Sequence, residues 1–183
     1  MSFWPGRLLV LSLTSALCCD WLSHYGQLSN KSLTLIDRMG GELTEEENPL
    51  SFPNRFYRRI RNKGVVSQLV FIRDSLKLIA NLFEHANLSA ANWDNDTTEN
   101  FLTIIDRQID ELDSCVSTNR TANSQLEKYY KRLERSTVQR RGGSAASWEL
   151  LRKDTKRHLV LLDMLVNSIR APAAVGRRRS AAH

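Results

Sequence analysis

The chain has 183 residues, of which 42% are hydrophobic and 25% are charged, and its 26 Lys and Arg against 20 Asp and Glu give a formal net charge of +6. This length fits one domain, and the apolar fraction suffices for a packed core, which excludes an intrinsically disordered chain. Only 4 Pro and 8 Gly are present, too few for the frequent turns of a β-sandwich or barrel, and the positive charge favours acidic partners without establishing nucleic-acid binding.

Residues 1–18 have the composition of a secretory signal peptide. Arg7 supplies the positive charge, an apolar run follows it, and the small residues Ala16 and Cys18 precede a cleavage site before Cys19. A cleavage after Ala16 is the alternative. The apolar run spans about ten residues, which is too short to cross a bilayer.

We therefore expect a secreted, extracellular protein that is not embedded in a membrane. The other interpretation of the first segment is an N-terminal core helix, which Pro5-Gly6 disfavours. Four Asn-x-Ser/Thr sequons agree with secretion. They begin at Asn30, Asn87, Asn95 and Asn119. Three lie in predicted loops or at helix starts, whereas Asn30 lies inside a predicted helix.

The cysteine count depends on the cleavage site. With a cleavage before Cys19, the mature chain keeps Cys19 and Cys115, an even pair in an oxidising compartment. A bridge between them would close a loop of about a hundred residues and contribute about 4–5 kcal/mol in the chain-entropy model. With a cleavage after Ala16, Cys18 remains as an additional thiol.

Apolar residues recur at helical spacing in five segments. The first covers residues 20–39, and Gly40-Gly41 ends it in the manner of a helix C-terminus. The second covers residues 65–84. Its apolar positions step by four and three residues: Val65, Leu69, Ile72, Leu76, Ile79 and Phe83. This spacing is typical of the seam of a helix bundle.

Residues 40–64 form a long link between these two helices. The link begins with glutamates, continues through Phe52-Pro53 and ends in a basic run. Antiparallel neighbours need only a short connection, so this link is expected to cross over the bundle. Long crossovers in a secreted bundle favour an all-α, five-helix, up-up-down-down long-chain cytokine fold with a long first crossover loop.

Capping boxes mark the starts of the third and fourth helices. Asp96-Thr-Thr-Glu99 begins the helix over 96–116, and Ser124-Gln-Leu-Glu127 begins the helix over 124–137. The fifth helix covers 147–170. The helical domain is therefore expected to span residues 19–170.

The segment 171–183 is expected to be a basic, disordered tail. Pro172 follows the fifth helix at a place where a helix cannot continue, and Arg177-Arg-Arg179 gives the segment its charge.

No residue pattern points to catalysis, a metal or a cofactor. The histidines lack a His or Cys partner at metal-ligand spacing, which argues against a zinc site. The chain has no Gly-rich phosphate loop, no G-x-S-x-G and no H-E-x-x-H motif. We therefore expect a protein that is not an enzyme and that works through its surface.

Two clusters of basic residues are candidate binding surfaces. One is the run over residues 55–63, and the other is the expected exposed side of the last helix. The second cluster comprises Arg152, Lys153, Lys156 and Arg157. A solubilising role is the simpler interpretation for any one of them, but their clustering favours binding. Few aromatic residues are interleaved with the bases, which argues against a single-stranded nucleic-acid groove.

Several segments together resemble the type I interferons, and in particular the teleost two-cysteine group. Trp93-Asp94 through Glu99-Asn-Phe101 to Leu112-Asp-Ser-Cys115 looks like the third helix of that family. Ser147-Trp-Glu-Leu-Leu-Arg152 looks like the start of its last helix, and Phe52-Pro53 matches the end of its long crossover. Cys19 matches the partner of Cys115. Mammalian alpha-type members have a second disulfide, for which residues 40–64 supply no cysteine.

The resemblance implies a monomeric cytokine that joins two different class II cytokine receptor chains, similar to interferon alpha/beta receptors. The assembled receptor would start Janus-kinase/STAT signalling and an antiviral state. By analogy, one receptor chain would contact the end of the first helix, the crossover and the last helix. The residues assigned to that contact are Arg38, Arg152, Lys153, Lys156, Arg157 and Val160. The second receptor chain would contact the second, third and fourth helices.

Two other functions remain open from the sequence. The chain could be an interleukin-10-like class II cytokine, which would dimerise by exchanging helices. It could instead be a basic helical effector that binds glycosaminoglycans or membranes through Arg177-Arg-Arg179, with an activity that falls steeply with salt.

Overall fold

The computed structural model describes residues 20–84, 88–116, 124–139 and 142–180, and in these ranges it contains helices and no strands. The α-helices are α2 (Asp20–Arg38), α3 (Asn54–Arg61), α4 (Val65–Glu84), α5 (Asn95–Cys115), α6 (Ser124–Glu134) and α7 (Ala145–Ser180). A short 3₁₀-helix covers Leu88–Ala90, and a π-helical turn over Arg135–Gln139 continues α6. The expected signal peptide (1–18) and Cys19 lie outside the described residues.

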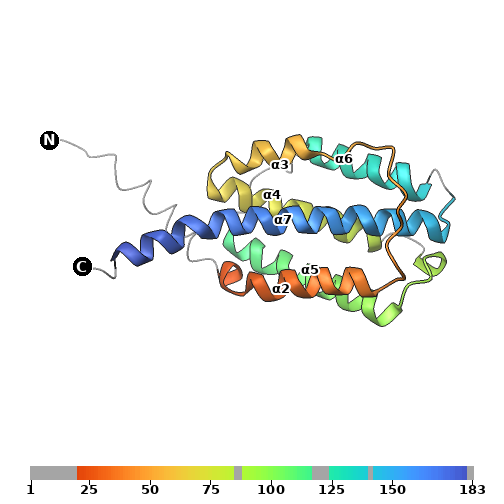
Figure 1. Cartoon of the computed structure of the whole chain (residues 1–183), viewed down its shortest axis with the longest axis horizontal. Helices are drawn as coiled ribbons and strands as arrows, with labels where there is room; N and C mark the ends of the chain where they lie inside the picture. The colour runs from red at the N-terminus through yellow and green to blue at the C-terminus, as the bar shows by residue number, and fades with distance from the viewer. Residues whose placement is uncertain (1–19, 85–87, 117–123, 140–141, 181–183) are drawn as a thin grey trace.

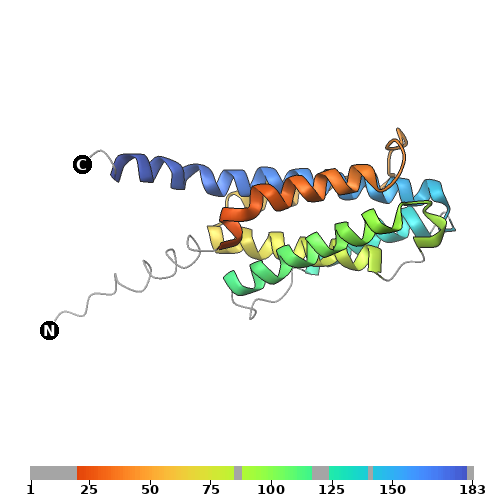
Figure 2. The ribbon, with the colours of Figure 1, turned by 90° about the horizontal axis from the view of Figure 1, so that it is seen from below.

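The helices form an up-up-down-down bundle, as the sequence predicted. In Figure 1, α2 and α4 run in one direction, and α5 and α7 run in the opposite direction. Figure 2 shows the same arrangement after a quarter turn, with α2 beside α7 and α4 beside α5. The link after α2 crosses over the N-terminal part of α7 before it reaches α3. The long first crossover is therefore confirmed.

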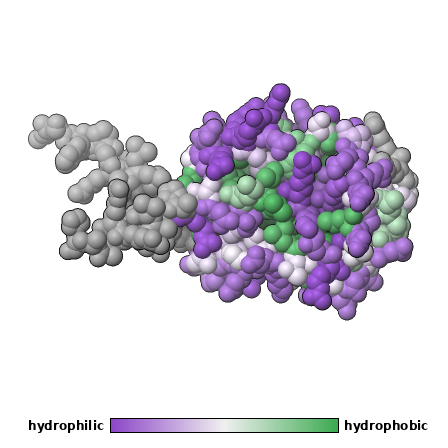
Figure 3. Space-filling model, viewed as in Figure 1, coloured by the Kyte–Doolittle hydropathy of each residue, from purple (hydrophilic) through white to green (hydrophobic). Residues whose placement is uncertain are grey.

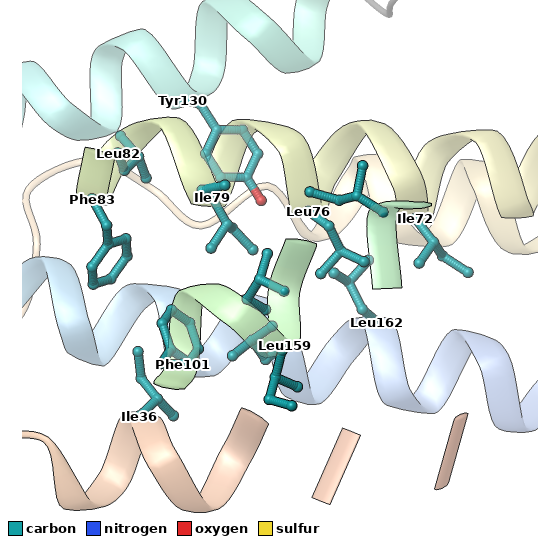
Figure 4. Close-up of a cluster of buried hydrophobic side chains, with 14 of the residues drawn as sticks. Ile36, Ile72, Leu76, Ile79, Leu82, Phe83, Phe101, Tyr130, Leu159 and Leu162 are labelled. Atoms are coloured by element: carbon teal, nitrogen blue, oxygen red, sulfur yellow. The ribbon is translucent and has the colours of Figure 1, made fainter. Parts of the chain in front are cut away.

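One hydrophobic core joins the helices. Ile36 of α2, Ile79 of α4, Phe101 of α5, Tyr130 of α6 and Leu159 of α7 meet in it (Figure 4). The predicted seam of the second helix is buried, with exposed fractions of 0–2% from its second position to its last. Full burial of such a side chain stabilises the fold by about 1.5–3 kcal/mol, so this seam is a main source of stability.

The crossover contains a helix where the sequence analysis expected only a link. Phe56, Tyr57 and Ile60 of α3 occupy neighbouring positions on one face of the helix and pack against the core. Pro53 directly precedes α3, a place where its missing N–H is not needed. The amphipathic pattern was too short to stand out among the surrounding charges.

The start of α5 differs from the predicted capping box. The N-cap residue is Asp94, whose Oδ1 accepts the backbone N–H of Thr97 at 2.8 Å. The prediction that Asp96 caps this helix is therefore wrong. Asp94 has the extended backbone (φ −66°, ψ 118°) that an N-cap needs, whereas Asp96 already lies in the first helical turn.

The last helix is longer than predicted. α7 continues through Pro172 to Ser180, although the sequence indicated an end at Arg170 and a disordered tail. A proline removes one backbone donor and crowds the carbonyl four residues earlier, which is that of Ser168. Residues 171, 173 and 174 are alanines, and their high helix propensity favours continuation of the helix across the interruption. Residues 181–183 lie outside the described part of the chain.

Candidate functional site

A buried arginine holds the end of α2 and the start of the crossover against α7. The Arg152 side chain is fully buried. Its Nη1 donates hydrogen bonds to the carbonyls of Ile36 at 2.9 Å and Asp37 at 3.0 Å, and its Nη2 donates to the carbonyl of Gly41. The guanidinium also pairs with the Glu149 carboxylate at 2.6 Å. The N-terminal turns of α7 are thereby joined to the end of α2.

The prediction that Arg152 lies on the exposed side of the last helix is wrong. The last four carbonyls of an α-helix have no partner within the helix. Because α2 ends at Arg38, the Ile36 and Asp37 carbonyls belong to this group, and they need donors from elsewhere. The planar guanidinium supplies several donors in a fixed fork. Arg152 therefore acts as a structural residue.

The same region brings two tryptophans together. Trp93 precedes α5 and donates from Nε1 to the Glu149 carboxylate, and its ring packs edge-on against Trp148 with centroids 5.8 Å apart. Gly40 passes directly beside this pair. A Cβ at Gly40 would lie 2.8 Å from both Glu149 Oε1 and Trp93 Cδ1, closer than a Cβ approaches other heavy atoms. The lack of a side chain at Gly40 allows this contact.

In addition to the buried Arg152, two lysines of α7 bind the crossover and the end of α2. Lys153 Nζ donates to the Glu46 carbonyl at 2.9 Å and pairs with the Glu47 carboxylate at 2.8 Å. The hydrogen bond from Lys153 lowers the pKa of Glu47. Lys156 Nζ pairs with Asp37 Oδ1 at 2.6 Å. Both lysine side chains remain partly exposed.

The next turn of α7 adds a cation and an apolar side chain to the same surface. The Arg157 guanidinium carbon lies 4.3 Å from the centre of the Phe52 ring, in a cation–π contact. Val160 is 39% exposed. Arg38, at the end of α2, is exposed as well. We call the surface formed by Arg38, Lys153, Lys156, Arg157 and Val160 the α2–α7 face.

A buried histidine lies beneath this face. His158 Nδ1 lies 2.7 Å from the Tyr57 hydroxyl, and its Nε2 lies 3.3 Å from the Tyr129 hydroxyl. The Phe52 ring covers the imidazole at 4.5 Å. Burial, reinforced by the neighbouring Arg157 charge, lowers the pKa of His158 to about 3. The neutral imidazole therefore joins the crossover, α3, α6 and α7 without carrying charge.

The other predicted sites are only partly described. Asn30, on α2, and Asn95, the first residue of α5, are exposed. Asn87, Asn119 and Cys19 lie outside the described residues. Glycosylation and the Cys19–Cys115 pairing therefore stay predictions.

Neither a candidate metal cluster nor a candidate membrane span occurs in the described ranges. Among these residues, no group of three or more His, Cys, Asp and Glu side chains is placed to hold a metal ion. No helix in the same ranges is long and apolar enough to cross a membrane.

Comparison with known proteins identifies the family. Residues 22–169 match the family model of the interferon alpha/beta domain. The chain is 38% identical to interferon a3 of Oncorhynchus mykiss over 160 residues, covering 86% of this chain and 91% of that protein. It is 26% identical to interferon alpha of Felis catus over 161 residues, covering 79% and 82%.

A solved structure agrees with these sequence matches. Zebrafish interferon 1 superposes with a TM-score of 0.71 at 29% identity, covering 82% of this chain and 99% of that one. The family match spans nearly the whole described domain, and it includes the tryptophans and Arg152 that join α2, α5 and α7. The chain therefore belongs to the type I interferon family and is similar to its teleost members.

Proposed function

We propose that this interferon is a secreted cytokine that bridges two different class II cytokine receptor chains. Receptor assembly then starts Janus-kinase/STAT signalling and an antiviral state. The observation that carries the proposal is the family membership of a chain whose α2–α7 face presents partly or fully exposed cations around Val160. In this role the protein acts as a monomeric ligand and not as an enzyme.

The composition of the α2–α7 face supports a role in binding. Protein interfaces combine an apolar centre with a polar rim and are enriched in arginine. Val160 supplies an exposed apolar side chain one helical turn from Lys156 and Arg157. We assign receptor contact to Arg38, Lys153, Lys156, Arg157 and Val160. Arg152 is left out because its side chain is buried, and it supports the face from within.

The experiment measures STAT phosphorylation in responsive cells of the source species after addition of the purified protein. The test variant is Lys156→Ala combined with Arg157→Ala. The variant loses the Lys156–Asp37 ion pair and the Arg157–Phe52 cation–π contact. Each contributes only up to about 1 kcal/mol to stability, so the variant remains folded. We expect its half-maximal concentration for signalling to rise at least tenfold.

The matched control is Lys31→Ala combined with Arg170→Ala. These side chains are also exposed, and their loss changes the net charge by the same amount outside the α2–α7 face. We expect the control to keep wild-type potency. Equal potency of the two variants would remove Lys156 and Arg157 from the receptor site. A folded wild-type protein that gives no phosphorylation would refute the cytokine proposal as a whole.

We propose further that residues 1–18 are removed on secretion and that Cys19 then pairs with Cys115. Support comes from Cys115, which is disulfide-bonded in the structure, and from the signal-like composition of residues 1–18. Mass spectrometry of the secreted protein tests both points. A mature chain beginning at residue 19 with no free thiol is expected, whereas free thiols at both positions would refute the pairing. Peptide mapping of the same sample determines which sequons carry glycans.

A further inference from the structure

The outer side of α3 carries a dense group of cations that the receptor proposal does not use. Its members are Arg55, Arg58, Arg59 and Arg61, with Lys63 two residues after the helix, and all five are exposed. None of them pairs with a carboxylate in the described part of the chain. The sequence has no acidic residue between Glu47 and Asp74. The charge of α3 is therefore not neutralised locally.

The packing of α3 turns these cations to solvent. Tyr57 is buried, and Phe56 and Ile60 pack against the core. This inner face fixes the rotation of the helix, so the arginines at the remaining positions form a broad arc on the outside. Figure 3 shows hydrophilic side chains over the position that α3 occupies in Figure 1.

Helix α6 extends the cationic surface. The Phe56 and Tyr129 rings pack edge-to-face with centroids 6.5 Å apart, and Arg59 Nη1 reaches Gln125 Oε1 at 3.5 Å. These contacts place α6 beside α3. The exposed cations of α6 and the turn after it are Lys128, Lys131, Arg132 and Arg135. We call the cations of α3, Lys63 and these four residues together the α3–α6 basic face.

A hollow in this face has the character of an anion site. Arg132 and Arg135 line it together with Pro49, Leu50 and Ser136, between the crossover and the end of α6. No carboxylate lines the hollow, and neither arginine forms an ion pair with a described residue. Guanidinium groups bind tetrahedral oxyanions through paired N–H donors. The hollow is therefore suited to a sulfate group that belongs to a longer polyanion.

We propose that the α3–α6 basic face binds a sulfated polysaccharide of the glycosaminoglycan class. A linear polyanion can follow a broad cationic surface and requires no apolar pocket. Repeated sulfate groups match a series of arginines spread over two helices. The surface differs from the α2–α7 face, so this inference stands or fails separately from the receptor proposal.

The structure favours this partner over two other polyanionic surfaces. A membrane-binding helix exposes apolar side chains that enter the bilayer, whereas the apolar residues of α3 point into the core. Single-stranded nucleic acids stack their bases on exposed aromatic rings. Tyr57 is buried and Phe56 is partly buried against the core, so neither ring is an open platform for bases.

The test measures binding of the mature secreted protein to immobilised heparin at 150 mM NaCl. The variant is Arg55→Ala with Arg58→Ala and Arg59→Ala, because alanine preserves the helix. The control is Lys31→Ala with Arg107→Ala and Arg170→Ala, which removes three exposed cations elsewhere. We expect the dissociation constant to rise at least tenfold in the variant and less than twofold in the control. Circular dichroism verifies folding, and Arg132→Ala with Arg135→Ala provides an independent second variant.

Further arms of the experiment identify the ligand. Binding should weaken steeply as salt screens the charges and should be lost on fully desulfated heparin. Equal losses in variant and control would overturn the proposal, because they would show a response to net charge alone. A loss confined to Arg177→Ala with Arg178→Ala and Arg179→Ala would move the site to the end of α7. Binding to phosphatidylserine vesicles but not to heparin would indicate a membrane surface and would also overturn it.

Discussion

Replacement of Arg152 by alanine tests whether this residue is structural. The change removes the guanidinium donors to the Ile36, Asp37 and Gly41 carbonyls and leaves Glu149 without its Arg152 partner. Removal of one member of a buried ion pair typically costs about 3–5 kcal/mol. A loss of about 4 kcal/mol is a large part of the roughly 5–15 kcal/mol that stabilises a typical domain.

The expected readout is a fall in the melting temperature. For a domain of this size each kcal/mol shifts Tm by about 2–4 °C, so Arg152→Ala should lower Tm by about 8–16 °C. Thermal unfolding of the secreted protein, followed by circular dichroism, measures this shift. Arg152→Lys should recover only part of the loss, because one ammonium group cannot reach the three carbonyls in the geometry of the guanidinium fork.

Lys153→Ala is the matched control for this experiment. Its side chain is partly exposed and its partner Glu47 is exposed, so its removal should change Tm by no more than about 2–4 °C. The STAT phosphorylation assay, read together with Tm, distinguishes a loss of folding stability from the loss of a direct receptor contact. An Arg152→Ala protein with wild-type Tm but without signalling would refute the structural assignment, because it would identify Arg152 as a direct receptor contact.

Three further predictions concern the same domain. Gly40→Ala should destabilise the fold by about 1–3 kcal/mol through the clash with Trp93, whereas Gly41→Ala, with open space around its Cβ, should not; urea unfolding compares the two. Asp94→Ala should lower Tm by about 2–4 °C through loss of the α5 cap, and Asp94→Asn should preserve it. His158 has a pKa of about 3 when folded against 6.5 as its model value, so the unfolded chain binds more protons between these limits. Stability should therefore fall as the pH drops from 6.5 towards 3, by up to about 1.4 kcal/mol per pH unit, and His158→Phe should reduce this slope in unfolding titrations.

The bundle was predictable because its main helices repeat apolar residues along their length. The stripe over 65–84 is buried almost entirely, and Leu126, Tyr130, Leu133 and Thr137 are buried as expected for the fourth helix. Short-range signals were less informative. The eight residues of α3 contain too few apolar positions for a clear period, and Asp96-Thr-Thr-Glu99 has the spacing of a capping box although Asp94 caps α5.

The candidate site was harder to predict because a basic residue can lie on either side of a helix. Trp148, Arg152, Thr155, Leu159 and Leu162 step by four and three residues, which is the seam pattern used elsewhere in the chain. That spacing already placed Arg152 on the buried stripe. Its charge nevertheless favours an exposed position, because an arginine is rarely buried unless it is paired. Its pairing partners are mainly backbone carbonyls, which a sequence does not reveal.

The two layers of contacts around α7 lead to a coupling between the crossover and the α2–α7 face. Residues 40–64 contain no cysteine, so no disulfide holds the crossover to α7. Arg152 anchors its first residues from inside, while Lys153 and Arg157 hold its later part from outside through Glu47 and Phe52. In the proposed receptor contact, a receptor group that binds Lys153 or Arg157 competes with Glu47 or Phe52 for the same cation. The proposal therefore predicts that receptor affinity depends on crossover order, and substitutions at Lys153 or Arg157 should be judged by signalling and by protection of the crossover amides from hydrogen exchange together.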